Sequence, residues 1–281
     1  MDDGGLNYCR DIVRRQDPDR YVLALLAPVG RRPALLSIYA FNVEISRIRE
    51  SVSEPMLGQM RLQWWRDTID ALFAGQSRAH PLAAPLAAAI MRHDLSQAHF
   101  MRLIDARSAD LDPVLPAAMD GLIDYAGETA APLIWLGLEI CGVSGRAAHD
   151  AGWSLGVAWA LSGLIRAMPF HLRRGWCCLP SDLLAKYQLD RSKLRQEVSR
   201  NNIIKLVKEI SETIDTNIEK SHELRSDIDR AAIPALRVAG FAQAYQRRLA
   251  RFGYDPFDPR LSAQPPFIAW RLMLRGLVGR Y

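Results

Sequence analysis

Apolar residues recur at helical spacing along nearly the whole of this 281-residue chain, and no stretch alternates apolar and polar residues as a half-buried strand does. In the segment from Ala34 to Ile48, for example, Ile38, Phe41 and Ile45 fall on one face of a helix. Helices of this kind bury their apolar stripes against one another. The chain is therefore predicted to fold as an all-α bundle.

Proline and glycine residues divide this pattern into separate helices. We expect helices over about residues 34–48, 56–73, 81–90, 96–109, 116–141, 147–168, 182–186, 231–252 and 266–279. The charged stretch from Lys205 to Glu223 is typical of a solvated helix face. The segment 147–168 is apolar on nearly every side, which predicts a helix at the centre of the bundle. No shift in composition and no internal repeat marks a boundary, so residues 1–281 are expected to form one domain.

The composition suits a soluble protein with a sizeable core, because 49% of the residues are apolar and 24% are charged. No apolar run approaches the ~20 residues that span a bilayer. The short acidic N-terminus is unlike a signal peptide, so we expect a cytoplasmic protein. The net charge of +5 is diffuse, which argues against nucleic acid and fits an anionic membrane surface or a phosphorylated ligand. The four cysteines lack metal-site spacing and are expected to be free thiols.

Several sequence blocks follow one another in an order that is more specific than any single motif. They are Ser-Ile-Tyr-Ala-Phe at 37–41, Met-Arg-Leu-Gln-Trp-Trp-Arg-Asp at 60–67, the aspartates of 103–111, Gly-Val-Ala at 156–158, and Arg-Arg-Gly with Leu-Pro between 173 and 180. In these blocks the chain resembles the squalene/phytoene synthase family, whose members join two isoprenoid diphosphates head to head. The resemblance implies an isoprenoid-synthase-type helical bundle with a central cavity.

Members of that family hold Mg²⁺ between two aspartate-rich motifs on opposed helices, and the metal ions grip the diphosphate of the substrate. By the resemblance, the first motif would occupy residues 46–50. This chain has Ser46, Arg47 and Glu50 at the positions of the three aspartates. Glu50 is the one carboxylate left, and Arg47 and Arg49 bring charge of the wrong sign. The first motif is therefore degenerate.

The second motif would place carboxylates at positions 167 and 171, where this chain has Ala167 and His171. Pro169, which stands between them, is expected to interrupt the helix. His171 is interpreted as a hydrogen-bonded pocket residue rather than a catalytic base. With nearly all oxygen ligands lost, we expect no catalytic residue, no bound metal and no cofactor; Mg²⁺ would be expected only of an active enzyme.

Without a metal, the remaining carboxylate and the nearby guanidinium groups are expected to find other partners. Glu50 is predicted to form an ion pair with an arginine, namely Arg47, Arg49 or Arg166. Three arginines close to the second motif are candidates for an anion-binding patch or, equally, for structural ion pairs with Glu50 or Asp182: Arg166, Arg173 and Arg174.

A divergent branch of the same family resembles this chain more closely, in Phe-Asn-Val-Glu at 41–44, Glu-Ser-Val-Ser-Glu at 50–54 and Arg-Ala-Met-Pro-Phe-His at 166–171. The animal representative of this branch assists the assembly of respiratory complex I, NADH:ubiquinone oxidoreductase. The resemblance implies a non-catalytic protein whose partner is a complex I subunit or assembly intermediate, at the inner face of a bacterial plasma membrane. Two alternatives stay open. One is a prenyl transferase with altered ligands, and the other is a prenyl-lipid-binding protein that uses the cavity without chemistry.

The last predicted helix, 266–279, carries Arg271 and Arg275 beside an apolar face and is followed by Arg280. A basic amphipathic helix can lie on an anionic membrane surface. It can also close a helical bundle, and the sequence analysis favours this second role.

Overall fold

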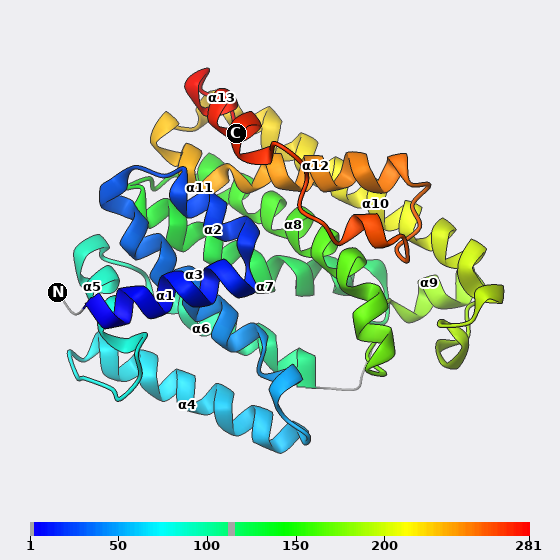
Figure 1. The fold of residues 1–281 in the computed structure, drawn as a ribbon, viewed down its shortest axis with the longest axis horizontal. Coiled ribbons are helices and arrows are strands. Elements are labelled where there is room, and N and C mark those ends of the chain that lie inside the picture. The colour runs from blue at the N-terminus through cyan, green and yellow to red at the C-terminus, as the bar shows by residue number, and fades with distance from the viewer. Residues whose placement is uncertain (1–2, 112–115) are drawn as a thin grey trace.

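The computed structural model describes residues 3–111 and 116–281, and within these ranges the chain forms helices and no strand. The α-helices are α1 Asp3–Gln16, α2 Pro18–Leu25, α3 Arg32–Ser46, α4 Pro55–Phe73, α5 Ala83–His93, α6 Gln97–Ser108, α7 Met119–Ile140, α8 Arg146–Arg173, α9 Ser181–Lys186, α10 Arg200–Glu223, α11 Ile233–Leu236, α12 Val238–Arg251 and α13 Ile268–Leu277 (Figure 1). Two 3-10 turns, η2 Arg49–Ser51 and η3 Ala109–Leu111, border the cavity described below. The all-α prediction is confirmed.

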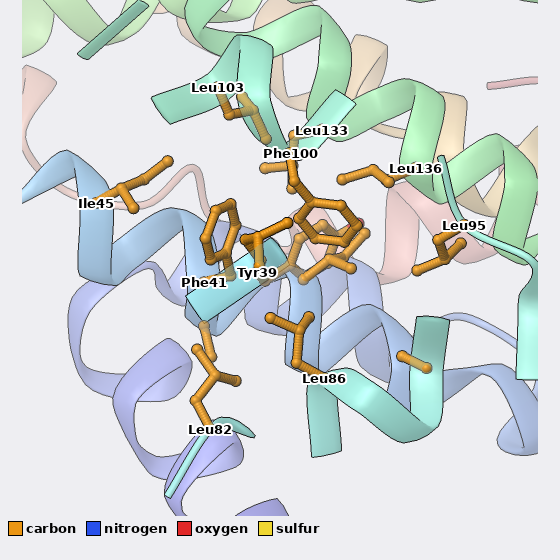
Figure 2. Packing of buried hydrophobic residues seen from close by; sticks show 14 of the residues in the cluster. Tyr39, Phe41, Ile45, Leu82, Leu86, Leu95, Phe100, Leu103, Leu133 and Leu136 are labelled. Atoms are coloured by element: carbon orange, nitrogen blue, oxygen red, sulfur yellow. The ribbon is translucent and has the colours of Figure 1, made fainter. Parts of the chain in front are cut away.

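The central pair of helices, α7 and α8, pack along each other, and α10 and α12 cover other faces of α8 (Figure 1). On the N-terminal side, α3 and α6 pack against α7, and α1, α4 and α5 complete that half of the molecule. Figure 2 shows the core of this half, where the rings of Phe41 and Phe100 meet edge to face with centroids 5.3 Å apart. In Figure 1, α4 lies at one edge of the molecule and α13 at the opposite edge.

The first two helices, α1 and α2, were not predicted from the sequence. Cys9 and Val13 of α1 and Leu23 of α2 are fully or almost fully buried. A local signal does mark the start of α2: Asp17 caps it by accepting a hydrogen bond from the main-chain nitrogen of Arg20 at 3.1 Å. These helices are therefore stabilised mainly by the core that they cover.

Small residues let α8 approach its neighbours closely, as its composition suggested. A Cβ atom at Gly156 would lie 2.6 Å from the main-chain nitrogen of Ala131 in α7. At Gly152, a Cβ would lie 2.9 Å from the indole of Trp135. The α7–α8 contact therefore has backbone against backbone at one point, with no room for a larger residue.

The predicted break of α8 at Pro169 is wrong, because the helix continues to Arg173. A proline removes one main-chain donor, and near the end of a long packed helix this loss is tolerated. Gly175 supplies the actual stop, since its φ of 70° lies in the left-handed region, where a residue without Cβ is favoured. His171 therefore lies on the last turn of α8.

Helix α8 is also the one helix in the described part of the chain that is long and apolar enough to cross a membrane by length and composition. The sequence analysis had found no such stretch. Half of the qualifying window is buried in the bundle, where α8 packs against α7, α10 and α12. Core helices of soluble proteins pass the same test, so this feature is weak evidence of a membrane span.

The packing of α8 predicts that the same substitution has opposite effects at two of its glycines. Gly156→Ala should lower the free energy of unfolding by about 1–3 kcal/mol, because the new methyl group meets the backbone of α7. Gly163→Ala is the matched control: apart from the adjoining backbone of α8 itself, no atom lies within 4 Å of its Cβ position, so it should gain up to about 1 kcal/mol from helix propensity. Urea unfolding followed by circular dichroism measures both. Equal stabilities for the two variants would contradict the proposed close contact.

Candidate functional site

A cavity of about 420 Å³ opens where the ends of α3 and α8 face the 3-10 turns η2 and η3. Side chains from five parts of the chain line it, and they are Ser46, Arg49, Glu50, Val52, Ser53, Arg107, Asp110, Tyr125, Leu164, Phe170, His171, Arg174 and Trp176. This cavity brings together residues of both degenerate motifs. It is the candidate functional site.

Of the motif positions singled out from the sequence, Ser46, Glu50 and His171 line this cavity. Arg47 does not; it is exposed and lines a separate pocket beside Trp64. Ala167 is half-buried on α8 and is absent from the walls of the cavity. The two motifs therefore meet at this cavity only through Ser46 and Glu50 of the first and His171 of the second.

The first motif does not form a continuous helix face, because α3 ends at Ser46, two residues earlier than predicted. The chain then turns, and Glu50 lies in the 3-10 turn η2. Carboxylates at i and i+4 share a face only within an α-helix. Even with aspartates at positions 46 and 50, this local geometry would not present them side by side.

The predicted ion pair of Glu50 is also wrong. Its side chain is exposed at the rim of the cavity, and within residues 3–111 and 116–281 it forms no ion pair with any arginine. Arg49, the nearest candidate, instead donates from Nη1 to the main-chain oxygen of Asp110 at 2.6 Å. Its guanidinium also lies over the ring of Trp176, 5.3 Å from the centroid. Solvent at the rim hydrates Glu50, so this carboxylate needs no cationic partner.

A buried cluster around Asp110 forms the wall of the cavity and was missed by the sequence analysis. The Asp110 carboxylate accepts a short hydrogen bond from the hydroxyl of Tyr125, and Arg107 Nη1 lies 3.3 Å from its other oxygen. Burial disfavours the charge of Arg107, but Asp110 and Tyr125 together outweigh this effect, and the arginine's pKa is raised. The pKa of Tyr125 is also raised, by burial and by Asp110, so its phenol stays protonated. The i, i+3 spacing of Arg107 and Asp110 was the available signal.

His171 is uncharged at neutral pH. Burial lowers its pKa to about 4, and the neighbouring Arg49 and Arg174 act in the same direction. Its ring meets the indole of Trp176 edge-on at a centroid distance of 4.4 Å. The side chain thus adds no positive charge to the cavity, and its surroundings resist protonation.

The three arginines close to the second motif, Arg166, Arg173 and Arg174, lie in different surroundings. Arg174 lines the cavity, with its guanidinium 4.4 Å from the ring centroid of Phe170. Arg173 is exposed and is absent from the lining of the cavity. Arg166 lies in a different cluster, where its Nη1 pairs with the buried carboxylate of Asp19 at 3.3 Å. The three arginines therefore do not share one cavity. Arg166 forms a structural ion pair, as the alternative interpretation held, but with Asp19 and not with Glu50 or Asp182. Arg49 and Arg107 supply the other positive charges of the cavity.

These positions do not fit Mg²⁺, which prefers carboxylate and other oxygen ligands in octahedral geometry. Three arginines line the cavity, and of its two carboxylates Asp110 is committed to Arg107 and Tyr125 while Glu50 lies at the rim. Among the described residues, no group of three or more histidine, cysteine, aspartate or glutamate side chains could hold a metal ion. The chemistry of the walls suits an anion instead.

A second, apolar cavity adjoins the first and shares Leu164, His171 and Trp176 with it. Its volume is about 20 Å³, and leucine, isoleucine and cysteine side chains make up most of its remaining walls. A space of this size holds about one water molecule. A long prenyl chain could enter only if these side chains moved.

The sequence as a whole matches the family model of squalene/phytoene synthase over residues 13–271. It is 27% identical over 274 residues to "NADH dehydrogenase (ubiquinone) complex I, assembly factor 6" of Bos taurus, which covers 98% of this chain and 82% of that protein. It is also 26% identical over 168 residues to the presqualene diphosphate synthase of Zymomonas mobilis, covering 59% of this chain and 57% of that enzyme.

Among solved structures, the squalene synthase of Alicyclobacillus acidocaldarius has a TM-score of 0.79 to this chain at 20% sequence identity. The superposition covers 90% of this chain and 96% of that one. The expected isoprenoid-synthase-type bundle is therefore confirmed as the fold.

The Asp110 cluster predicts unequal effects for two neutralised carboxylates in one cavity. Asp110→Asn should cost about 3 kcal/mol of stability, because Arg107 would remain buried without its counter-charge. Glu50→Gln is the matched control and should change stability by less than about 0.5 kcal/mol, since the side chain is exposed. Urea unfolding measures both. A loss on Glu50→Gln as large as on Asp110→Asn would show that the rim, not the wall, holds this part of the fold.

Proposed function

The chain belongs to the squalene/phytoene synthase family, and on that premise we propose that it is a non-catalytic member that assists the assembly of respiratory complex I, NADH:ubiquinone oxidoreductase. The observation that carries the proposal is the charge of the cavity. Beside the degenerate motif positions, the cavity presents three arginines and a neutral His171, whereas the Mg²⁺ of family enzymes requires carboxylates.

Loss of the metal site removes the means of catalysis. Departure of pyrophosphate from a prenyl diphosphate builds negative charge on the leaving group, which metal ions stabilise in the family's reaction. Arginines can bind a diphosphate, but here the apolar space behind them is about 20 Å³. The substrate's hydrocarbon chain therefore has no preformed site next to the place where its diphosphate would bind.

The extent of the sequence similarity supports the same reading. Similarity to the bovine assembly factor covers 98% of this chain, whereas similarity to the presqualene diphosphate synthase covers 59%. A protein that keeps the whole fold without the ligand set retains a rigid helical surface. Such a surface suits a partner protein, which we propose to be a subunit or assembly intermediate of complex I.

A deletion strain tests this proposal directly. Loss of the gene should lower the NADH:quinone oxidoreductase activity of membranes and the amount of assembled complex on native gels, while polyprenoid content stays unchanged. Succinate:quinone oxidoreductase activity of the same membranes is the internal control, because it does not depend on complex I. Normal complex I with depleted polyprenoids would assign the chain to the prenyl transferases instead.

A second candidate function, metal-independent binding of a phosphorylated ligand, is favoured by the three arginines of the cavity. Titration calorimetry with a non-hydrolysable farnesyl diphosphate analogue, with and without Mg²⁺, distinguishes both of these functions from that of a metal-dependent prenyl transferase. We expect no heat that depends on Mg²⁺.

Any metal-independent binding in that titration should weaken by about tenfold in Arg174→Gln, because one charge-assisted contact is lost. Arg173→Gln, one residue away and exposed outside the cavity, is the matched control and should bind as the wild type does. A stoichiometric heat that requires Mg²⁺ would contradict the non-catalytic proposal.

A further inference from the structure

The C-terminal helix α13 presents an apolar face to solvent. Trp270, Leu274, Leu277 and Val278 are 62%, 53%, 75% and 64% exposed, and Met273 beside them is also exposed. Positions 270, 273, 274, 277 and 278 follow the i, i+3, i+4 spacing of a single helix stripe. These five residues therefore form one exposed apolar stripe on α13 and its C-cap, and α13 lies at the edge of the molecule (Figure 1).

The opposite side of α13 fixes the helix to the bundle. Ile268 and Leu272 are buried, and a Cβ at Gly240 of α12 would lie 2.2 Å from the end of Leu272. Arg275 Nη1 donates to Gln243 Oε1 at 2.6 Å. The helix that carries the exposed stripe is thus anchored along its inner face. This inner face is sufficient to close the bundle, so the outer stripe is not needed for that role.

Positive charge surrounds the exposed stripe. Arg271 and Arg275 lie on α13, Arg280 follows it, and Arg247 reaches the same region from α12. Burial lowers the pKa of Arg275, and the mutual repulsion of these arginines acts in the same direction. In the described part of the chain, none of the four pairs with a carboxylate within 4 Å, although Asp215 and Glu219 share a neighbouring pocket with Arg247.

A pocket of about 400 Å³ lies at the end of the stripe, and Leu274 and Val278 of the stripe line it together with Arg275 and Arg280. His222 in its wall is uncharged, since burial and the nearby arginines lower its pKa to about 4. Arg225 completes the wall and donates to the main-chain oxygen of Tyr281 at 3.4 Å. The lining of this pocket thus combines apolar side chains of the stripe with three arginines.

We propose that α13 docks this protein on an anionic lipid bilayer, with its outer stripe among the acyl chains and the arginine-lined pocket at the level of the lipid phosphates. An aromatic residue and aliphatic residues on one face, flanked by arginines, match the layering of a bilayer surface. The proposal goes beyond the assembly role, because membrane docking requires no complex I subunit.

Charge complementarity favours a bilayer over a second copy of this chain. A two-fold contact through α13 would bring two sets of arginines together, and like charges across an interface weaken association. A bilayer rich in anionic lipid offers the opposite charge over the whole footprint. Matching the stripe with a client protein would require that protein to be acidic around an apolar groove.

Vesicle sedimentation with the full-length protein tests the proposal. Partitioning onto vesicles of phosphatidylglycerol and phosphatidylcholine should exceed that onto pure phosphatidylcholine by about tenfold or more at low salt, and should fall as salt is raised. The double variant Leu274→Glu with Leu277→Glu should lose at least about tenfold in partitioning, because charged groups replace the inserting side chains.

The matched control is Met56→Glu with Met60→Glu on α4, whose side chains are as exposed as those on α13 but lie at the opposite edge of the molecule. This variant should partition as the wild type does. Circular dichroism melting of both double variants checks that each remains folded, and a variant of Arg271→Gln with Arg280→Gln, whose side chains are exposed, tests the charge separately.

Three results would overturn the proposal: no partitioning onto anionic vesicles, equal partitioning onto neutral ones, or equal losses from the α13 and α4 variants. Light scattering without vesicles tests whether a second copy of the chain covers the stripe. A wild-type dimer that dissociates in the α13 variant would assign the stripe to a dimer interface. Each of these results leaves the assembly proposal standing, because the vesicle assay contains no complex I.

Discussion

The close contact between α7 and α8 is the constraint on which the rest of the structure depends. At Gly156 the backbones of the two helices approach so closely that a single methyl group would meet Ala131. Helices this near to each other exclude larger side chains from their interface and fix the path of α8 through the bundle. Helices α10 and α12 then pack on α8, while α3 and α6 pack on α7. The positions of both halves of the core therefore depend on the α7–α8 pair.

The path of α8 also decides how its polar residues are used. Arg166, about two turns before the end of α8, meets the buried carboxylate of Asp19. Asp19 also accepts hydrogen bonds from Tyr245 at 2.7 Å and Gln264 at 2.9 Å. This cluster ties α2, α8, α12 and the segment before α13 together. His171, on the last turn, faces the cavity instead. Arg166, a candidate anion-binding residue in the sequence, thus stabilises the fold instead, because the buried carboxylate of Asp19 requires a cation.

The cavity and the outer face of α13 are two separate places where the chain can meet something else. In the cavity, three arginines and a neutral histidine lie beside the degenerate motif positions, and the adjoining apolar space is nearly filled. At α13, arginines surround apolar side chains that remain exposed. Arginines outnumber carboxylates at both places, but the first is a cavity and the second is an open surface at the edge of the molecule. A scaffold at a membrane could use the second without any chemistry at the first.

The sequence by itself determined the helical class and the family resemblance, because apolar spacing and short motifs are local properties of the chain. It also showed the missing aspartates, since a residue's identity needs no coordinates. Only the tertiary structure decided which charges meet: Arg166 with Asp19, 147 positions apart, and Arg49 with the main-chain oxygen of Asp110, 61 positions apart. Packing likewise carried α8 through Pro169 and left the outer side of α13 uncovered, because a helix's end and its exposed face depend on neighbours that the local sequence does not name.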